Sequence, residues 1–408
     1  MKKILFLEYD FDYGGRQKVS LDILNSLVTS GEFQVDLCLL FPGGIWDAMI
    51  PQAVNRVNIF DIPIDDVQRI ILKADQKYSV SANIKNRHFL RSLRLLFNSS
   101  FRKNRHLRYG QVYNHIKQDK YDYAICPSLT ASSIVTAIIA KVNASMKYAW
   151  LHRSFCAFKD KKKFNLPQEA VKSHINHDVD LLSIFDKIIC VSGSIKRLFD
   201  YYFPYLADRS VVMYNALDTE RILRLSQEGV NDIPNGELKI ATVGRAEYEK
   251  GLHIMLDAAK RLKSNGYKFT WYFVGNGSLL EKSKVQVKKF GIEDIVFFLG
   301  SKDNPYPYIK ACDIYIQPSL TEAYSTTVNE ARILGKPVIA TRFSGISEQI
   351  VSGTNGLICD ISGKALAEAI KTAIDDGRWR TFAKNAAYPN RQEKEKMFDV
   401  KKLMDNCC

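Results

Sequence analysis

Two carboxylates stand eight positions apart in the run TEAYSTTVNEARILGKPVIAT, residues 321–341. Glu322 precedes Ser325 and Thr326, either of which can cap a helix, and Glu330 falls about one turn inside that helix. The free amides at the helix start would bind an anion, whereas carboxylates repel phosphate and can accept hydrogen bonds from hydroxyls. The run therefore suits a ligand that is anionic in the middle and rich in hydroxyls at both ends. Alternatively, Glu330 faces solvent and Glu322 merely stabilises the helix start.

Two cations occupy the loop VGRAEYEKG, residues 243–251, where Arg245 and Lys250 stand between Gly244 and Gly251. An apolar strand pattern precedes this loop. Cations at the carboxyl edge of a parallel strand lie where doubly wound folds bind ligands, and an arginine can bind a diphosphate bidentately. Taken alone, a solvated charged loop explains the same residues about equally well.

The elements that must position these residues alternate along the chain. Short apolar runs such as residues 2–9 and 269–274 are separated by helix-patterned stretches, which predicts parallel strands buried on both faces. The alternation indicates an α/β fold with doubly wound sheets. Residues 217–237 are polar, contain Asn-Gly and Pro, and lack a strand pattern. We interpret them as a linker between domains at 1–216 and 238–385, followed by a helical segment at 386–408.

Composition is that of a soluble globular protein, with 408 residues, 46% hydrophobic and 25% charged. No apolar run is long enough to span a membrane, and the run from Ile4 to Leu7 is too short for a signal peptide. We therefore expect a cytoplasmic protein. The eight cysteines lack CxxC or zinc-finger spacing, so we predict neither a disulfide framework nor a metal site.

The formal charge of +14 predicts a polyanionic partner. Much of it lies in residues 85–108, where arginines flank an apolar stripe at helical spacing. A helix lying on an anionic membrane is one interpretation, and a surface helix docked on its own domain is the other. No nucleic-acid recognition motif accompanies the charge, so a nucleic-acid partner is not expected. The cations expected to face a membrane or an acceptor are Arg91, Arg94, Arg102, Lys103 and Arg105.

The ordered set of motifs resembles the family 4 retaining glycosyltransferases of GT-B fold, especially bacterial capsular and exopolysaccharide enzymes. It comprises DYGGRQ, WLHRS, FDKIICVS, YNALD, VGR with EKG, FVGNGSLLE, FFLGS, and the E-x7-E run followed by GKPVIAT. The resemblance covers roughly residues 1–360. It implies two Rossmann-like domains facing each other across a cleft. The first would bind the acceptor and the second a nucleotide-sugar donor, and the last segment would cross back to the first domain.

The resemblance also implies roles for single residues. Glu322 would hold hydroxyls of the transferred sugar, and Glu330 would hold the ribose diol. Arg245 and Lys250 would neutralise the diphosphate, while His152 would face the reacting carbon or the acceptor. The remaining positions expected to bind the donor are Gly15, Gly244, Gly275, Ser319, Tyr324, Ser325 and Thr326.

The implied reaction is retaining transfer of a hexose or N-acetylhexosamine from a UDP-sugar to a lipid-linked or polymeric glycan. It would need no metal or other cofactor, and the protein would lie on the inner face of the membrane. Two departures stand out: Ala323 to Ser325 replace a glycine-containing stretch and could reshape the sugar pocket, and GGRQK lacks the glutamate of many relatives. A non-catalytic partner or glycan-binding subunit, or a nucleotide-sugar epimerase of GT-B fold, is the alternative.

Overall fold

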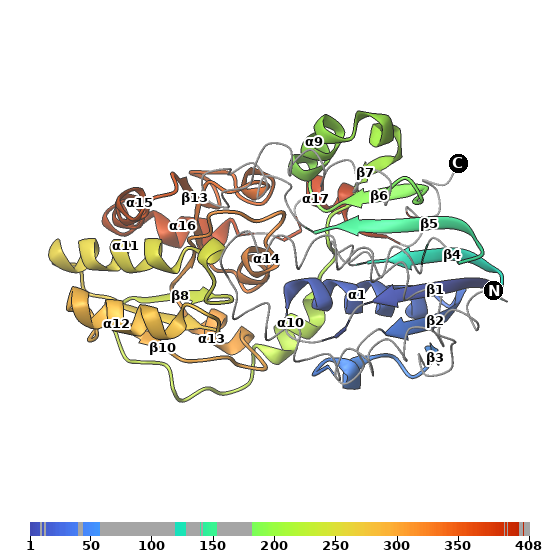
Figure 1. Ribbon diagram of the computed structural model, residues 1–408. Coiled ribbons are helices and arrows are strands. Elements are labelled where there is room, and N and C mark those ends of the chain that lie inside the picture. The colour runs from blue at the N-terminus through green and yellow to red at the C-terminus, as the bar shows by residue number, and fades with distance from the viewer. Residues whose placement is uncertain are drawn as a thin grey trace, which may run out of the picture.

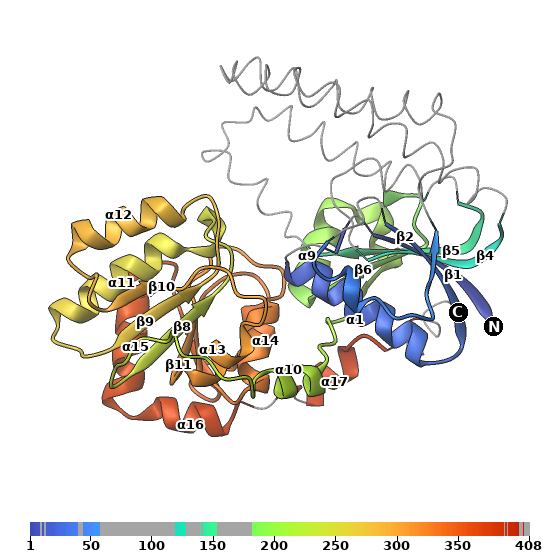
Figure 2. The same ribbon diagram turned by 90° about the horizontal axis from the view of Figure 1, so that it is seen from below.

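The computed structural model describes residues 1–8, 10–11, 14–39, 44–57, 119–127, 139, 142–152, 182–386, 388–389, 391–399 and 403. They form two α/β units, each built on a parallel sheet (Figures 1 and 2). The cations expected to face a membrane or an acceptor, Arg91, Arg94, Arg102, Lys103 and Arg105, lie outside the described residues. No helix in the described ranges combines the length and apolarity needed to cross a bilayer.

The first unit contains a seven-stranded sheet of order β3-β2-β1-β4-β5-β6-β7. Its strands are β1 (Lys2–Glu8), β2 (Phe33–Leu39), β3 (Asn55–Val57), β4 (Tyr121–Cys126), β5 (Ala144–Leu151), β6 (Lys187–Cys190) and β7 (Ser210–Val212). Its described helices are α1 (Gly15–Thr29), η1 (Asp47–Met49), α9 (Gly193–Tyr202) and η4 (Pro204–Arg209). The strand order reverses direction between β1 and β4, and such switch points are where open α/β sheets bind ligands.

The second unit contains a six-stranded sheet of order β10-β9-β8-β11-β12-β13. Its strands are β8 (Lys239–Val243), β9 (Thr270–Val274), β10 (Val296–Phe298), β11 (Ile314–Gln317), β12 (Val338–Thr341) and β13 (Gly356–Cys359). Its helices are η5 (Tyr248–Lys250), α11 (Leu252–Ser264), α12 (Leu280–Phe290), α13 (Tyr306–Ala311), α14 (Thr326–Ile333), η6 (Ile346–Glu348), α15 (Gly363–Asp375) and α16 (Arg378–Lys384). The switch point here falls between β8 and β11.

Burial on both faces explains why the apolar runs became strands. All five residues of β9 are buried, as are all four of β11 and all four of β12. Helices cover both faces of the second sheet, so its continuous apolar runs carry no exposed side. The predicted α/β fold with two parallel sheets is confirmed.

Two segments connect the units. Helix α10 (Thr219–Leu225) falls inside the predicted linker, and its Arg221 forms a buried ion pair with Asp22 of α1 at 2.7 Å. The second segment, residues 391–398, begins with α17 (Arg391–Lys396), and we call it the strap. Phe398 donates its backbone N–H to the carbonyl of Tyr214 at 2.8 Å, in the first unit. The domain bounds assigned from the sequence stay a prediction.

The strap is also fixed to the second unit. Glu393 forms an ion pair of 2.5 Å with Arg332 of α14, and both side chains are almost completely buried. The ring of Tyr388 lies 5.3 Å from the same guanidinium. The strap therefore contacts both units at once.

Candidate active site

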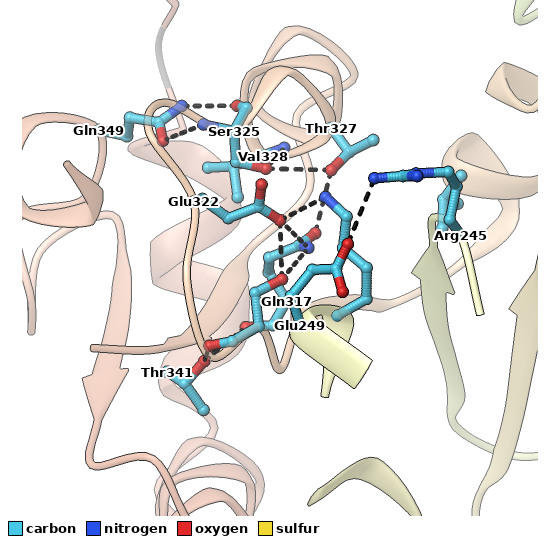
Figure 3. A network of polar contacts seen from close by, with 12 residues as sticks. Arg245, Glu249, Gln317, Glu322, Ser325, Thr327, Val328, Thr341 and Gln349 are labelled. Atoms are coloured by element: carbon cyan, nitrogen blue, oxygen red, sulfur yellow. Dashed lines mark hydrogen bonds and ion pairs between the residues drawn. The ribbon is translucent and has the colours of Figure 1, made fainter. Parts of the chain in front are cut away.

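Glu322 lies at the carboxyl edge of the second sheet, in the loop between β11 and α14, where several donors meet one of its oxygens. Its Oε1 accepts hydrogen bonds from Lys250 Nζ at 2.6 Å, Ser319 Oγ at 2.8 Å and Gln317 Nε2 at 3.3 Å. Figure 3 shows the other carboxylate oxygen directed away from these three donors. The three donors hold the carboxylate in one orientation. Glu322 is therefore suited to accept hydrogen bonds from a ligand.

Direct backbone packing brings Lys250 to Glu322. Gly251, which follows η5, has a φ of 70°, and a Cβ there would lie 1.8 Å from the carbonyl oxygen of Pro318. Only glycine tolerates both the conformation and the approach. The backbone N–H of Leu320 also donates to the carbonyl of Glu249 at 2.8 Å. The loop that carries Lys250 and the loop that carries Glu322 are thus one packed unit.

Arg245 does not join this cluster. Its guanidinium contacts Glu249 at 3.4 Å, and its side chain is 63% exposed. Figure 3 places it on the far side of Glu249 from Glu322. Gly244 and Gly275, both predicted to bind the donor, pack against each other. A Cβ on Gly275, whose φ is 147°, would lie 1.8 Å from the carbonyl oxygen of Gly244. They allow the ends of β8 and β9 to pack closely and shape the loop that carries Arg245.

The start of α14 is capped as the sequence predicted. Ser325 is the N-cap, and its Oγ accepts from the N–H of Val328 at 3.4 Å. Gln349 binds the backbone of Ser325 twice, accepting from its N–H at 3.0 Å and donating to its carbonyl at 2.7 Å. The amide of Ser325 was expected near the sugar. In this structure it is already paired with Gln349, a residue that the sequence analysis did not identify.

The first turns of α1 and α14 meet where the two units approach each other (Figures 1 and 2). A Cβ on Gly15 would lie 2.7 Å from Thr326 Oγ1, so these two predicted donor positions are brought together. Gly15 is the first residue of α1, and Thr326 is the first residue of α14. The positive ends of two helix dipoles therefore converge, which favours an anion at this point.

Glu330 is buried, with 3% of its surface exposed, so the alternative that it faces solvent is wrong. Its Oε1 lies 2.5 Å from Nζ of Lys18, which belongs to α1 of the first unit. Lys18 was not among the site residues predicted from the sequence. Its position one helical turn after Gly15 could have identified it, because that side of α1 would face a ligand bound at the glycine loop.

Tyr324 belongs to the contact between the units. Its ring stacks on Tyr214 with centroids 4.9 Å apart, and its hydroxyl donates to Glu393 of the strap at 3.2 Å. The side chain is buried, and its influence on a sugar pocket stays a prediction. Ser319 is also fully buried, and its hydroxyl donates to Glu322 at 2.8 Å.

His152 directly follows β5, and its Nε2 lies 2.7 Å from the carbonyl oxygen of Pro127. Nε2 must therefore carry the proton in the neutral ring, which leaves Nδ1 as an acceptor. Burial, together with the nearby charge of Arg16, lowers the pKa of His152 to about 4. The ring is neutral at pH 7 and lies near the start of α1, and its described contacts are not with Glu322.

The model of the family Glycosyl transferases group 1 matches residues 224–391. The match falls almost entirely on the second unit. An uncharacterized glycosyltransferase of Methanocaldococcus jannaschii is 33% identical over 177 residues, which cover 43% of this chain and 45% of that protein. The 4-α-N-acetylgalactosaminyltransferase of Campylobacter jejuni that acts on a diphospho-undecaprenol substrate is 27% identical over 194 residues, 47% of this chain and 50% of that protein. The chain thus spans about half the length of the curated relatives it matches.

Solved structures match over the whole chain. Anabaena HepE, crystallised with UDP, has a TM-score of 0.68 at 19% identity, with 100% of this chain and 98% of HepE covered. WaaG, a glycosyltransferase involved in lipopolysaccharide biosynthesis, has a TM-score of 0.62 at 16% identity, with coverages of 99% and 98%. The predicted GT-B fold and the resemblance to family 4 glycosyltransferases of bacterial polysaccharide synthesis are confirmed.

The range matched by the family model contains the predicted site residues of the second unit. Lys250, Glu322 and Glu330 all lie inside residues 224–391. Lys18 and His152 lie outside that range, in the first unit. The site as a whole therefore requires both units.

Proposed function

We propose that the protein is a glycosyltransferase that moves a hexose or N-acetylhexosamine from a UDP-sugar to a lipid-linked or polymeric glycan. The transfer proceeds with retention and without a metal ion, in the synthesis of a surface polysaccharide. One observation carries this proposal: a carboxylate fixed by Lys250 stands beside the meeting point of two helix N-termini. That arrangement matches a ligand with an anionic centre and hydroxyls at its ends.

Each part of the donor has a partner in this proposal. The starts of α1 and α14, with Lys250, bind the diphosphate. The free oxygen of Glu322 accepts hydrogen bonds from the sugar hydroxyls, and Glu330 accepts them from the ribose diol. A UDP-linked donor is supported by HepE, whose structures hold UDP and UDP-glucose.

The chemistry follows from where charge develops. When the bond between the anomeric carbon and the phosphate oxygen breaks, negative charge grows on the diphosphate, and Lys250 and the helix starts stabilise it. Arg245 joins them by exchanging its partner Glu249, because an exposed ion pair contributes only about 0–1 kcal/mol. The acceptor hydroxyl attacks the face that the diphosphate leaves, and a diphosphate oxygen takes its proton. Attack on that face retains the anomeric configuration.

His152 faces the acceptor side of the reaction in this proposal. Its neutral ring accepts a hydrogen bond at Nδ1 and brings no positive charge close to the oxocarbenium-like carbon. Such a charge would raise the energy of the transition state.

The proposed glycan acceptor is inferred from the relatives, and the proposed membrane location is inferred from the charge of this chain. The Campylobacter jejuni relative acts on a glycan linked to diphospho-undecaprenol, and other relatives are named for colanic acid biosynthesis. Residues 85–108 would hold the protein on the anionic inner face of the membrane. Sedimentation with liposomes tests this part. Binding that increases with anionic lipid is expected, and equal binding to neutral and anionic vesicles contradicts it.

The donor is tested by a thermal-shift screen of nucleotide sugars. A ligand at about 100 times its Kd stabilises the native state by about 2.7 kcal/mol, or roughly 5–10 °C for one domain. A stabilising UDP-sugar is then tested for radiolabel transfer to lipid-linked glycans. Absence of UDP binding at millimolar concentration would indicate a non-catalytic partner subunit. Release of UDP and free sugar without an acceptor would indicate an epimerase.

A further inference from the structure

Lys18 is a residue of the first unit whose charged group is enclosed by the second unit. Its side chain is 7% exposed, and Nζ lies 2.5 Å from Oε1 of Glu330 in α14. On another side, Nζ lies 4.2 Å from the ring centroid of Tyr306 in α13, which is itself buried. The ammonium group is therefore held between a carboxylate and an aromatic face.

The ion pair with Lys18 determines how the carboxylate of Glu330 can accept hydrogen bonds. A carboxylate this deeply buried is costly unless a cation stands beside it, because burial disfavours a charge. Lys18 supplies that cation, and a carboxylate paired at Oε1 still offers hydrogen-bond acceptor sites on both oxygens. Because Lys18 binds Oε1, it also sets the direction in which Oε2 points.

Hydroxyl groups cannot take the place of Lys18. A ribose diol offers two neutral O–H donors, whereas removal of one partner of a buried ion pair leaves an uncompensated charge. The pair must therefore persist when a nucleotide binds, and the diol must bind a carboxylate that is already paired.

We infer that Lys18 is a positioning residue for the ribose of the nucleotide: it holds the carboxylate of Glu330 ready to accept hydrogen bonds from the 2′- and 3′-hydroxyls. The inference rests on the proposed function, in which Glu330 binds the ribose diol. Because Lys18 belongs to the first unit, the ribose site is complete only when α1 lies against α14. Nucleotide binding and the approach of the two units are thereby coupled.

The experiment compares the affinities of the full chain for UDP and for 2′,3′-dideoxy-UDP by calorimetry. Hydrogen bonds to a charged group predict that the wild-type protein prefers UDP by about 10- to 100-fold. Lys18→Gln, which keeps a hydrogen-bond donor and loses the charge, is expected to reduce this ratio to less than about threefold. Lys18→Met is expected to do the same, and Lys18→Arg to retain most of the ratio.

A second variant separates positioning from a general structural defect. Arg221→Met is the matched control, since it breaks the other buried ion pair of α1, with Asp22 at 2.7 Å. It is expected to lower stability and to leave the ratio unchanged.

Glu330→Gln distinguishes failure of this inference from failure of the proposed function. If Glu330→Gln abolishes the ratio and a folded Lys18→Gln retains it, the inference is overturned and the ribose site stands. If Glu330→Gln retains the full ratio, Glu330 does not bind the diol, and both fail. If Lys18→Met does not fold, Lys18→Gln decides the question.

Discussion

The substitution Glu322→Gln alters the chemistry of the site while keeping its packing. The amide oxygen of glutamine can occupy the position of Oε1 and accept from Lys250, Ser319 and Gln317. The amide nitrogen then replaces Oε2, so a group that accepted hydrogen bonds becomes one that donates them. The sugar hydroxyls lose their acceptor, and the nucleotide contacts remain.

The magnitude follows from this exchange. A hydrogen bond to a charged group contributes about 1.5–3 kcal/mol, and loss of one preorganised electrostatic partner lowers kcat by roughly 100- to 1,000-fold. We expect a decrease of that size in the turnover of Glu322→Gln. The Kd for UDP should change by less than about threefold, because UDP lacks the sugar that Glu322 holds.

Two assays and one control variant test the prediction for Glu322→Gln. Transfer is followed from a set of radiolabelled UDP-sugars, and UDP binding is measured by calorimetry on the same preparation. Glu281→Gln is the control, since it removes a glutamate that pairs with Lys284 on the exposed face of α12. Undiminished turnover of Glu322→Gln would refute the assignment. An equal loss of UDP affinity would show that Glu322 supports the nucleotide and not the sugar.

Three further predictions follow. Arg332→Met leaves the buried carboxylate of Glu393 without its guanidinium and should lower the free energy of unfolding by about 3–5 kcal/mol in urea denaturation; a loss below about 1 kcal/mol would contradict this. His152 should stay neutral from pH 8 to pH 5 in histidine NMR spectra. Because the pKa of His152 is about 4 in the folded protein and about 6.5 in the unfolded chain, the free energy of unfolding should rise with pH between these values. An NMR titration midpoint of His152 above pH 6 would contradict this prediction. Gly251→Ala should destabilise by at least about 1–3 kcal/mol, since its Cβ meets a backbone carbonyl. Gly266→Ala is its control, with a φ of 81° and nothing within 4 Å, and equal melting temperatures would contradict the packing argument.

Local patterns in the sequence were sufficient to predict the parallel sheets. The runs of β9 and β11 are mainly apolar because both faces of these strands are buried, and this pattern is visible in single segments. A cap at Ser325 or Thr326 was predicted from the local sequence, and in the structure Ser325 is the N-cap. The direct pairing of Lys250 with Glu322 could not be predicted, because it depends on the approach of Gly251 to a carbonyl in a distant loop.

Contacts between the two units lay beyond the sequence. Lys18 and Glu330 are 312 residues apart, and nothing in either segment specifies the other. The stacking of Tyr324 on Tyr214 arises in the same way, since a tyrosine after the first glutamate reads equally well as a sugar contact. The periodicity of hydrophobic residues indicates which face of a helix or strand is buried, but it does not indicate which other segment covers that face.

The strap gives the protein an unusual order of assembly during synthesis. Trp150 of β5 packs on Phe398, and the hydroxyl of Tyr148 reaches the carbonyl of Leu403, 255 residues further along the chain. At roughly 5–20 residues per second, a ribosome needs about 13–51 s to supply that partner. Throughout this interval the first sheet lacks contacts that cover its interior, while the second unit is already emerging. The first unit to be translated is thus the last to be completed, because Phe398 and Leu403 supply part of its packing.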